Sequence, residues 1–201
     1  MPDQQEMHER FGKLIYDVVG QVGFVKTSIP AQEGDISLQE AVEMVLRTLP
    51  HYLAEALSLR YGLTGTEPYT YSALGLLLPR KNGKSEKQAT NDAAHKLYTA
   101  MDMLYHSAVQ DFLELFCQNI PGEANRRIEI IRDLIRLREA LQTLEKERAL
   151  TFLENALWRK NATLRTLIEA QKNEELRSWK NIGSRSLELA QEIVTYAKAP
   201  A

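Results

Sequence analysis

The chain has 201 residues, a formal net charge of −2 at pH 7 and 44% hydrophobic residues. This length fits one or two domains, and the apolar share is large enough for a sizeable core, which excludes wholesale disorder. The slight acidity excludes a generally polycationic protein, so any binding to nucleic acid must come from a local basic patch.

Glycine and proline are scarce, with 10 and 7 residues, while alanine, leucine, glutamate and lysine are plentiful. That composition favours helix, and we expect an all-α fold. No apolar run approaches the roughly 20 residues that span a bilayer, and the first residues lack the apolar core of a signal peptide. With Cys117 as the single cysteine, an internal disulfide is excluded. We therefore expect a cytoplasmic protein without a membrane segment.

The first 36 residues are predicted to form an N-terminal helix and a loop. Apolar residues spaced by three and four place one stripe on a helix over about residues 3–22. The stretch 26–35, which contains Pro30 and Gly34, is predicted to be a loop.

A second unit, residues 37–104, begins with a capping pattern. Ser37 is followed three residues later by Glu40, which predicts the start of a helix. Its buried face is predicted to comprise Val42, Val45, Leu46 and Leu49. Pro50 then opens a further helix that stops at Gly62, and residues 64–68 form a turn.

A short helix is predicted over 71–78, where Pro79 ends it, and a basic loop follows over 79–84. Ser85, with Gln88 three residues on, caps a long helix expected to run to about Gln118. Its inner face is predicted to comprise Ala89, Ala93, Leu97, Met101, Leu104, Ala108, Phe112 and Leu115. Residues 119–122 break it.

The third unit comprises residues 105–201. Within it, residues 123–198 carry an apolar stripe whose period lies between 3.5 and 3.6 residues. This pattern, without an internal proline, predicts a helical hairpin, small bundle or short coiled coil. The segment Trp158-Arg159-Lys160-Asn161 is faintly echoed by Trp179-Lys180-Asn181.

The strings over 38–104 also carry a resemblance. The Leu49-Pro50 corner, LSLRYGL at 57–63 and GTEPYTYSALG at 65–75 resemble region four of bacterial sigma factors. The resemblance implies a helix-turn-helix whose second helix lies in the DNA major groove. No part of the chain matches sigma region two, so it is not a complete sigma factor.

By this resemblance, the candidate DNA-binding residues surround the start of the helix after the turn. They are Arg80, Lys81, Lys84, Ser85, Glu86, Lys87, Gln88, Thr90 and Asn91. Glutamine and asparagine can pair with adenine, lysine can reach guanine or phosphate, and glutamate can accept from cytosine. The basic loop is placed for phosphates, and the implied partners are double-stranded DNA and RNA polymerase.

An alternative function stays open because this sequence departs from the family pattern. The loop 79–84 adds residues to the turn, Asp92 occupies a position that is aliphatic in the family, and the helix after the turn has few cations. The alternative is a helical protein–protein interaction module, such as an adaptor or regulator in a larger complex, including one of a phage or mobile element. In either case the C-terminal helices would dock a partner or a second copy of the chain.

We expect no enzymatic activity, metal or cofactor. His95 and His106 are eleven residues apart, three turns along one predicted helix, too far apart to share a metal. No Cys-x-x-Cys, His-Glu-x-x-His, phosphate-binding loop or nucleophile elbow is present. Cys117 follows Phe116 on an apolar face and is predicted to be a buried thiol.

Overall fold

The computed structural model describes residues 38–63, 67–77, 85–104, 106–117, 121–145 and 147–198. Over these residues the chain forms α-helices and one 3-10 helix without a strand, which confirms the all-α prediction. The helix predicted at 3–22, the loop at 26–35, Ser37 and the basic loop at 79–84 lie outside the described residues.

Helix α2, Leu38–Arg47, and helix α3, His51–Tyr61, meet at the predicted Leu-Pro corner. The Pro50 carbonyl accepts hydrogen bonds from the Leu53 and Ala54 amides, so the proline starts α3 as expected. Gly62 ends α3 in the left-handed region at φ 68°, a conformation that suits glycine. Ala41 and Val45 of α2 and Leu49 just after it are buried, while Val42 and Leu46, predicted for the same buried face, are only half-buried.

Helix α4, Tyr71–Leu77, and helix α5, Glu86–Leu104, begin at polar caps. The Thr70 hydroxyl accepts from the Ala73 amide at 3.2 Å. Ser85 and Gln88 form the predicted reciprocal cap, because the Gln88 amide donates to Ser85 Oγ at 3.3 Å and the Ser85 amide donates to Gln88 Oε1 at 2.9 Å.

The prediction of one helix over 85–118 is wrong. Helix α5 ends at Leu104, and a separate helix, α6, spans Ser107–Cys117. His106 caps α6: its carbonyl accepts from the Val109 amide, and its Nδ1 accepts from the Ala108 amide at 3.3 Å. His95 therefore lies on α5 and His106 precedes α6, so the two histidines do not share a helix face. Because histidine is not a usual capping residue, the local sequence pattern does not predict the end of one helix and the start of another here.

The C-terminal part is more finely divided than a hairpin or coiled coil. It comprises α7 (Pro121–Gln142), α8 (Arg148–Arg159), α9 (Leu164–Lys172), the 3-10 helix η1 (Glu175–Ser178) and α10 (Ser184–Lys198). Gly122, expected in a break, lies in α7. Asn161 and Asn181 take positive φ angles, 48° and 69°, at the turns before α9 and α10. The two echoed segments thus both end at an asparagine-mediated turn.

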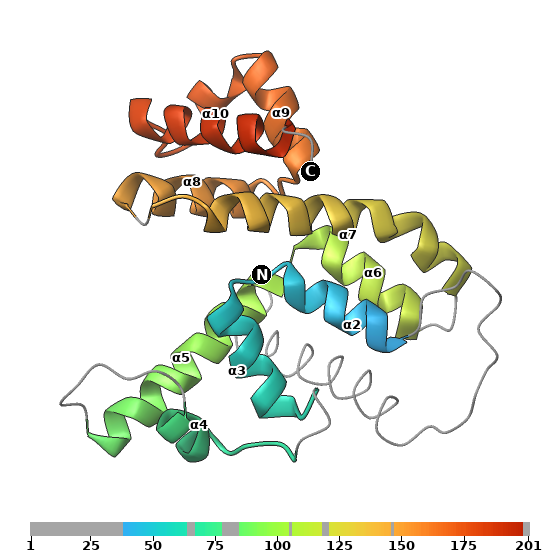
Figure 1. Cartoon of the computed structure of the whole chain (residues 1–201), viewed down its shortest axis with the longest axis vertical. Coiled ribbons are helices and arrows are strands. Elements are labelled where there is room, and N and C mark those ends of the chain that lie inside the picture. Colours follow the sequence, from blue (N-terminus) through green and yellow to red (C-terminus); the bar gives the residue numbers. More distant parts are fainter. Residues whose placement is uncertain are drawn as a thin grey trace.

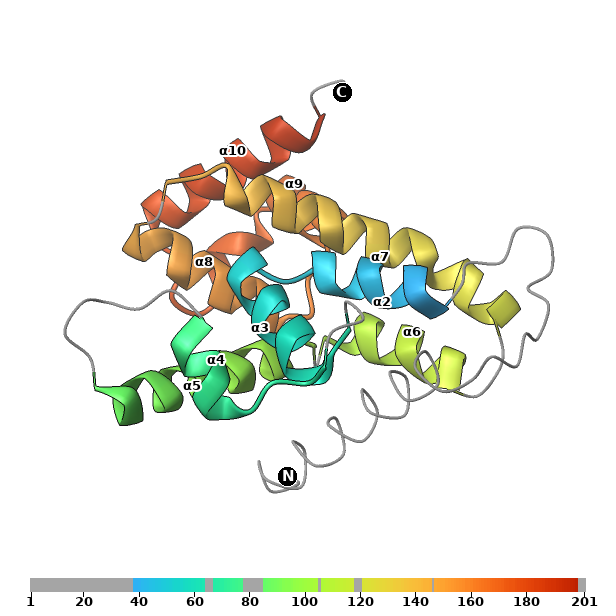
Figure 2. The same cartoon turned by 60° about the horizontal axis from the view of Figure 1, so that its bottom comes forward.

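Helix α7 lies between helices α2–α6 and the C-terminal helices α8–α10 (Figures 1 and 2), and two hydrophobic core clusters meet along it. The first cluster contains residues of α2 to α6 and of α7 up to Ile135. The second contains residues of α7 from Leu137 onward and of α8, α9, η1 and α10. The two clusters therefore divide within α7, and the sequence-based boundary at 104/105 falls inside the first of them.

Candidate nucleic-acid interface

Helices α3, α4 and α5 pack on one another through the first cluster. Leu53 and Leu57 of α3, Leu74 of α4, and Ala93 and Leu97 of α5 are all nearly or fully buried in it. The short α4 precedes the longer α5, and the two helices lie side by side (Figure 1). This layout is compatible with the two helices of a helix-turn-helix.

Close packing at Gly75 fixes α4 against α5. A Cβ atom built on Gly75 would lie 2.8 Å from the Ala89 carbonyl carbon and 2.8 Å from the Thr90 nitrogen. Only glycine permits that approach, so the sequence string Leu74-Gly75 has a direct packing function. The first two turns of α5 are held in place by this contact.

The candidate residues at the start of α5 face solvent. Ser85, Glu86, Lys87, Gln88 and Asn91 are exposed, and Thr90 is half-buried. Local hydrogen bonds occupy several of these groups: Gln88 Oε1 accepts from Ser85 in the cap, and the Thr90 hydroxyl donates to the Glu86 carbonyl, four residues earlier, at 3.0 Å. Within the described part of the chain, Lys87 and Asn91 make no polar side-chain contact, so their donors are available to a ligand.

Arg80, Lys81 and Lys84 lie outside the described residues, so the structure brings only the α5 members of the candidate set together. Glu86, in the first turn, places a negative charge beside Lys87. The described part of this surface is therefore polar, without a strong positive charge.

Sequence reasoning missed two residues on the same face. His95 and Tyr98 are exposed, and they continue the series of Lys87 and Asn91 along α5. His95 follows Asn91 by four residues, and Tyr98 follows His95 by three. Tyr98 is 46% exposed, high for a large aromatic side chain. Extending the helical spacing beyond the first two turns would have identified both.

Arg60, from the sigma-like string, stabilises the fold near this surface. Its guanidinium lies 4.9 Å from the ring centre of Tyr71, and Nη1 donates to the Tyr69 carbonyl at 3.1 Å. Burial raises the pKa of the neighbouring Tyr61, and the proximity of Tyr71 adds to this shift. Arg60 thus holds the segment before α4 against α3.

No protein-family model, curated protein or solved structure matches this chain. The likeness to sigma region four therefore rests on the strings at 49–75 and stays a prediction. No helix in the described ranges combines the length and hydrophobicity that crossing a bilayer requires. Nor do the described residues contain a cluster of three potential metal ligands, while the side chain of Cys117 lies outside the described set.

Proposed function

We propose that the chain is a cytoplasmic, transcription-linked DNA-binding protein that inserts the start of α5 into the major groove. The observation that carries the proposal is the exposed polar face of α5, held by the close contact of α4 at Gly75. An α-helix fits the major groove, and residues near the start of such a helix reach base edges.

Each side chain has a defined role in this proposal. The Asn91 amide pairs with adenine, since it offers a donor and an acceptor on one plane. Lys87 contacts guanine or phosphate. Gln88 retains its amide NH₂ as a donor, because its oxygen is engaged in the cap. The basic residues Arg80, Lys81 and Lys84 contact phosphates, and no step of this function requires a catalytic group or cofactor.

The test is selection from random duplex DNA by the purified full-length protein, at low and moderate salt. We compare the wild type with a variant carrying Arg80→Ala, Lys81→Ala, Lys84→Ala and Lys87→Ala. A control variant removes four exposed cations of the C-terminal part, Arg159, Lys172, Arg177 and Lys180. Both variants lose the same charge, so only position differs.

We expect wild-type binding that weakens with salt, is lost in the first variant and is retained in the control. Absence of salt-dependent binding by the wild type would exclude the proposal. Equal loss in both variants would show that net charge governs the binding and that the α5 surface does not.

The second candidate function, a protein-interaction module that docks on RNA polymerase or another machine, is favoured by exposed apolar side chains. Leu76 and Leu77 at the end of α4 are 55% and 54% exposed, and Tyr52 on α3 is 44% exposed. Under this function Leu77→Glu abolishes association with purified RNA polymerase, whereas Lys87→Ala has no effect. Association that survives Leu77→Glu but is lost in Lys87→Ala would exclude this apolar surface as the docking site.

A further inference from the structure

Two chain corners meet where the two core clusters join. The first corner lies between α5 and α6, and the second lies between α8 and α9. The Ser107 amide of the first corner donates to Asn161 Oδ1 of the second at 3.0 Å. The His106 ring stands edge-on to the Trp158 ring, with their centres 6.0 Å apart at an angle of 62°. We name these two interactions the corner contact.

A small cavity lies beside the corner contact and is lined by both charged and apolar groups. Its lining residues include His106, Trp158, Arg138 of α7 and Glu154 of α8. Arg138 donates from Nε to the Thr48 carbonyl and from Nη1 to Glu154 Oε1, both at 3.1 Å. The other lining residues, from α5 to α8 and from the chain beside α2 and α9, are uncharged.

The hydrogen bond that His106 accepts defines the tautomer of its neutral ring. Nδ1 accepts from the Ala108 amide, so the single proton of the neutral ring sits on Nε2. The residue is 4% exposed, and among the described residues Nε2 has no hydrogen-bond partner of ordinary geometry. His106 is thus a buried titratable side chain whose outer nitrogen lacks a hydrogen bond of ordinary geometry.

A second proton is incompatible with this arrangement. It would have to sit on Nδ1, where it removes the acceptor that the Ala108 amide requires. It would also place a positive charge in the cavity that holds Arg138, whose carboxylate partner Glu154 is already bonded to it. Burial lowers the pKa of His106, and the adjacent backbone of Ala162 and Asn161 offsets this only in part.

We propose that His106 makes the corner contact pH-sensitive, so that its protonation releases the α5–α6 corner from the α8–α9 corner and loosens the first core cluster from the second. This regulation is independent of DNA binding by α5. Since the closed state favours neutral His106, the contact is fully stable above the ordinary histidine pKa of about 6.5 and weakens as the pH falls below it.

The experiment follows hydrogen exchange of the Ser107 amide by NMR in the full chain between pH 8 and pH 5, corrected for intrinsic exchange. The expected result is an opening constant that rises below pH 6.5 by up to about tenfold per pH unit. The matched control is His106→Asn, since its Oδ1 can accept from the Ala108 amide but does not titrate. A second control, Glu154→Gln, removes the acid in the cavity.

The proposal requires that His106→Asn abolish the pH dependence and that Glu154→Gln retain it. Flat protection in the wild type, or an unchanged pH response in His106→Asn, would overturn it. If the asparagine variant does not fold, direct titration of the His106 ring in the wild type decides. A His106 midpoint that differs from the midpoint of Ser107 opening would equally exclude the mechanism.

Discussion

Gly75 of α4 lies so close to Ala89 of α5 that a Cβ atom on Gly75 would be 2.8 Å from the Ala89 carbonyl carbon and 2.9 Å from its oxygen. The neighbouring atoms belong to the backbone of a 19-residue helix, which cannot rotate away as a side chain can. This contact therefore sets the position of the proposed DNA-binding helix relative to α4.

Replacing Gly75 by alanine is expected to destabilise the protein. Overpacking costs about 1–3 kcal/mol, against which the better helix propensity of alanine contributes about 1 kcal/mol. Because the clash is with backbone, we expect the overpacking to dominate, with a net loss measured by urea unfolding. Binding to DNA should weaken in parallel, since α5 must shift.

The matched control is Gly183→Ala, just before α10. A Cβ atom there meets no atom within 4 Å, so the change should alter stability by less than about 0.5 kcal/mol. Equal losses at Gly75 and Gly183 would show that the α4–α5 approach is looser than the structure has it.

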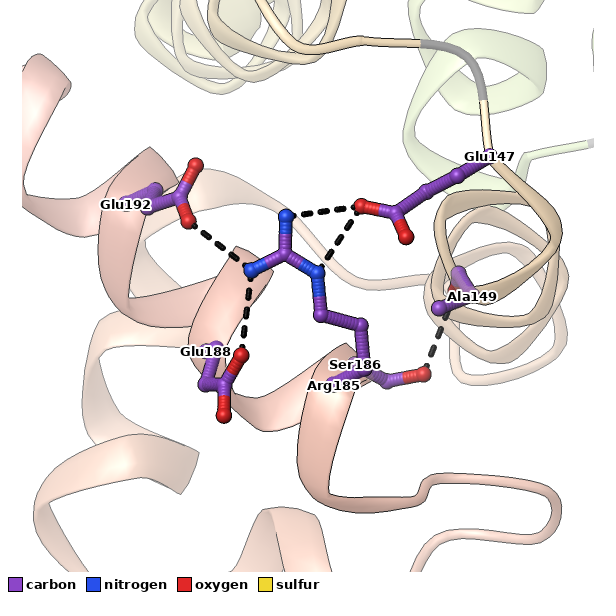
Figure 3. A network of polar contacts seen from close by, with 6 residues as sticks. All are labelled: Glu147, Ala149, Arg185, Ser186, Glu188 and Glu192. Atoms are coloured by element: carbon purple, nitrogen blue, oxygen red, sulfur yellow. Dashed lines mark hydrogen bonds and ion pairs between the residues drawn. The ribbon is translucent and has the colours of Figure 1, made fainter.

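The docking of α10 on α8 combines an exposed ionic network with one buried hydrogen bond (Figure 3). Arg185 contacts Glu147, Glu188 and Glu192 at 2.8–3.3 Å, and Glu147, then Glu188, raise the pKa of Arg185. Its neighbour Ser186 is 2% exposed and donates to the Ala149 carbonyl at 3.1 Å.

We predict that Ser186→Ala destabilises the protein by about 1 kcal/mol at any salt concentration, because a buried acceptor loses its donor. Arg185→Gln should have an effect that is visible at low salt and disappears at high salt, since exposed charges are screened. Thermal unfolding of both variants at low and high salt measures the difference. A salt-independent effect of Arg185→Gln would mean that its packing, and not its charge, stabilises α10.

Local chemistry predicted the elements whose ends depend on neighbouring residues. Gly62 ends α3, and Ser85 with Gln88 starts α5, because these caps are complete within a few residues. The break before α6 could not be predicted in this way, because it depends on an unusual histidine cap and on Asn161, which lies 54 residues from Ser107.

The candidate site likewise combines features that local sequence predicts with features that depend on tertiary contacts. The resemblance placed Lys87 and Asn91 on the exposed side of the helix, and their spacing of four residues puts them on one face of α5. The contact of α4 at Gly75 depends on tertiary packing, and the turns at Asn161 and Asn181 depend on a left-handed conformation that asparagine adopts only in context. Those turns divide the predicted C-terminal run into short helices.

The ion pair of Arg138 and Glu154 joins α7 to α8 and carries a third prediction. Burial lowers the pKa of Arg138, and Glu154 opposes this shift. Their side chains are 11% and 37% exposed, so the pair lies between a buried and a surface salt bridge. A double-mutant cycle with Arg138→Met and Glu154→Gln should give a coupling of about 1–2 kcal/mol. A coupling near zero would show that water already solvates both groups.

Lys87 and Asn91 should differ in how they contribute to DNA binding. Lys87→Ala is expected to weaken binding to all duplexes and to reduce the salt dependence by about one counterion, because a phosphate contact is independent of sequence. Asn91→Ala should leave the salt dependence unchanged and reduce discrimination at one base pair by about 1–3 kcal/mol. Titrations of the selected duplex and of single-base variants, at several salt concentrations, separate the two effects. If both variants change only the salt dependence, α5 contacts the backbone alone, and sequence must be read by another part of the chain or not at all.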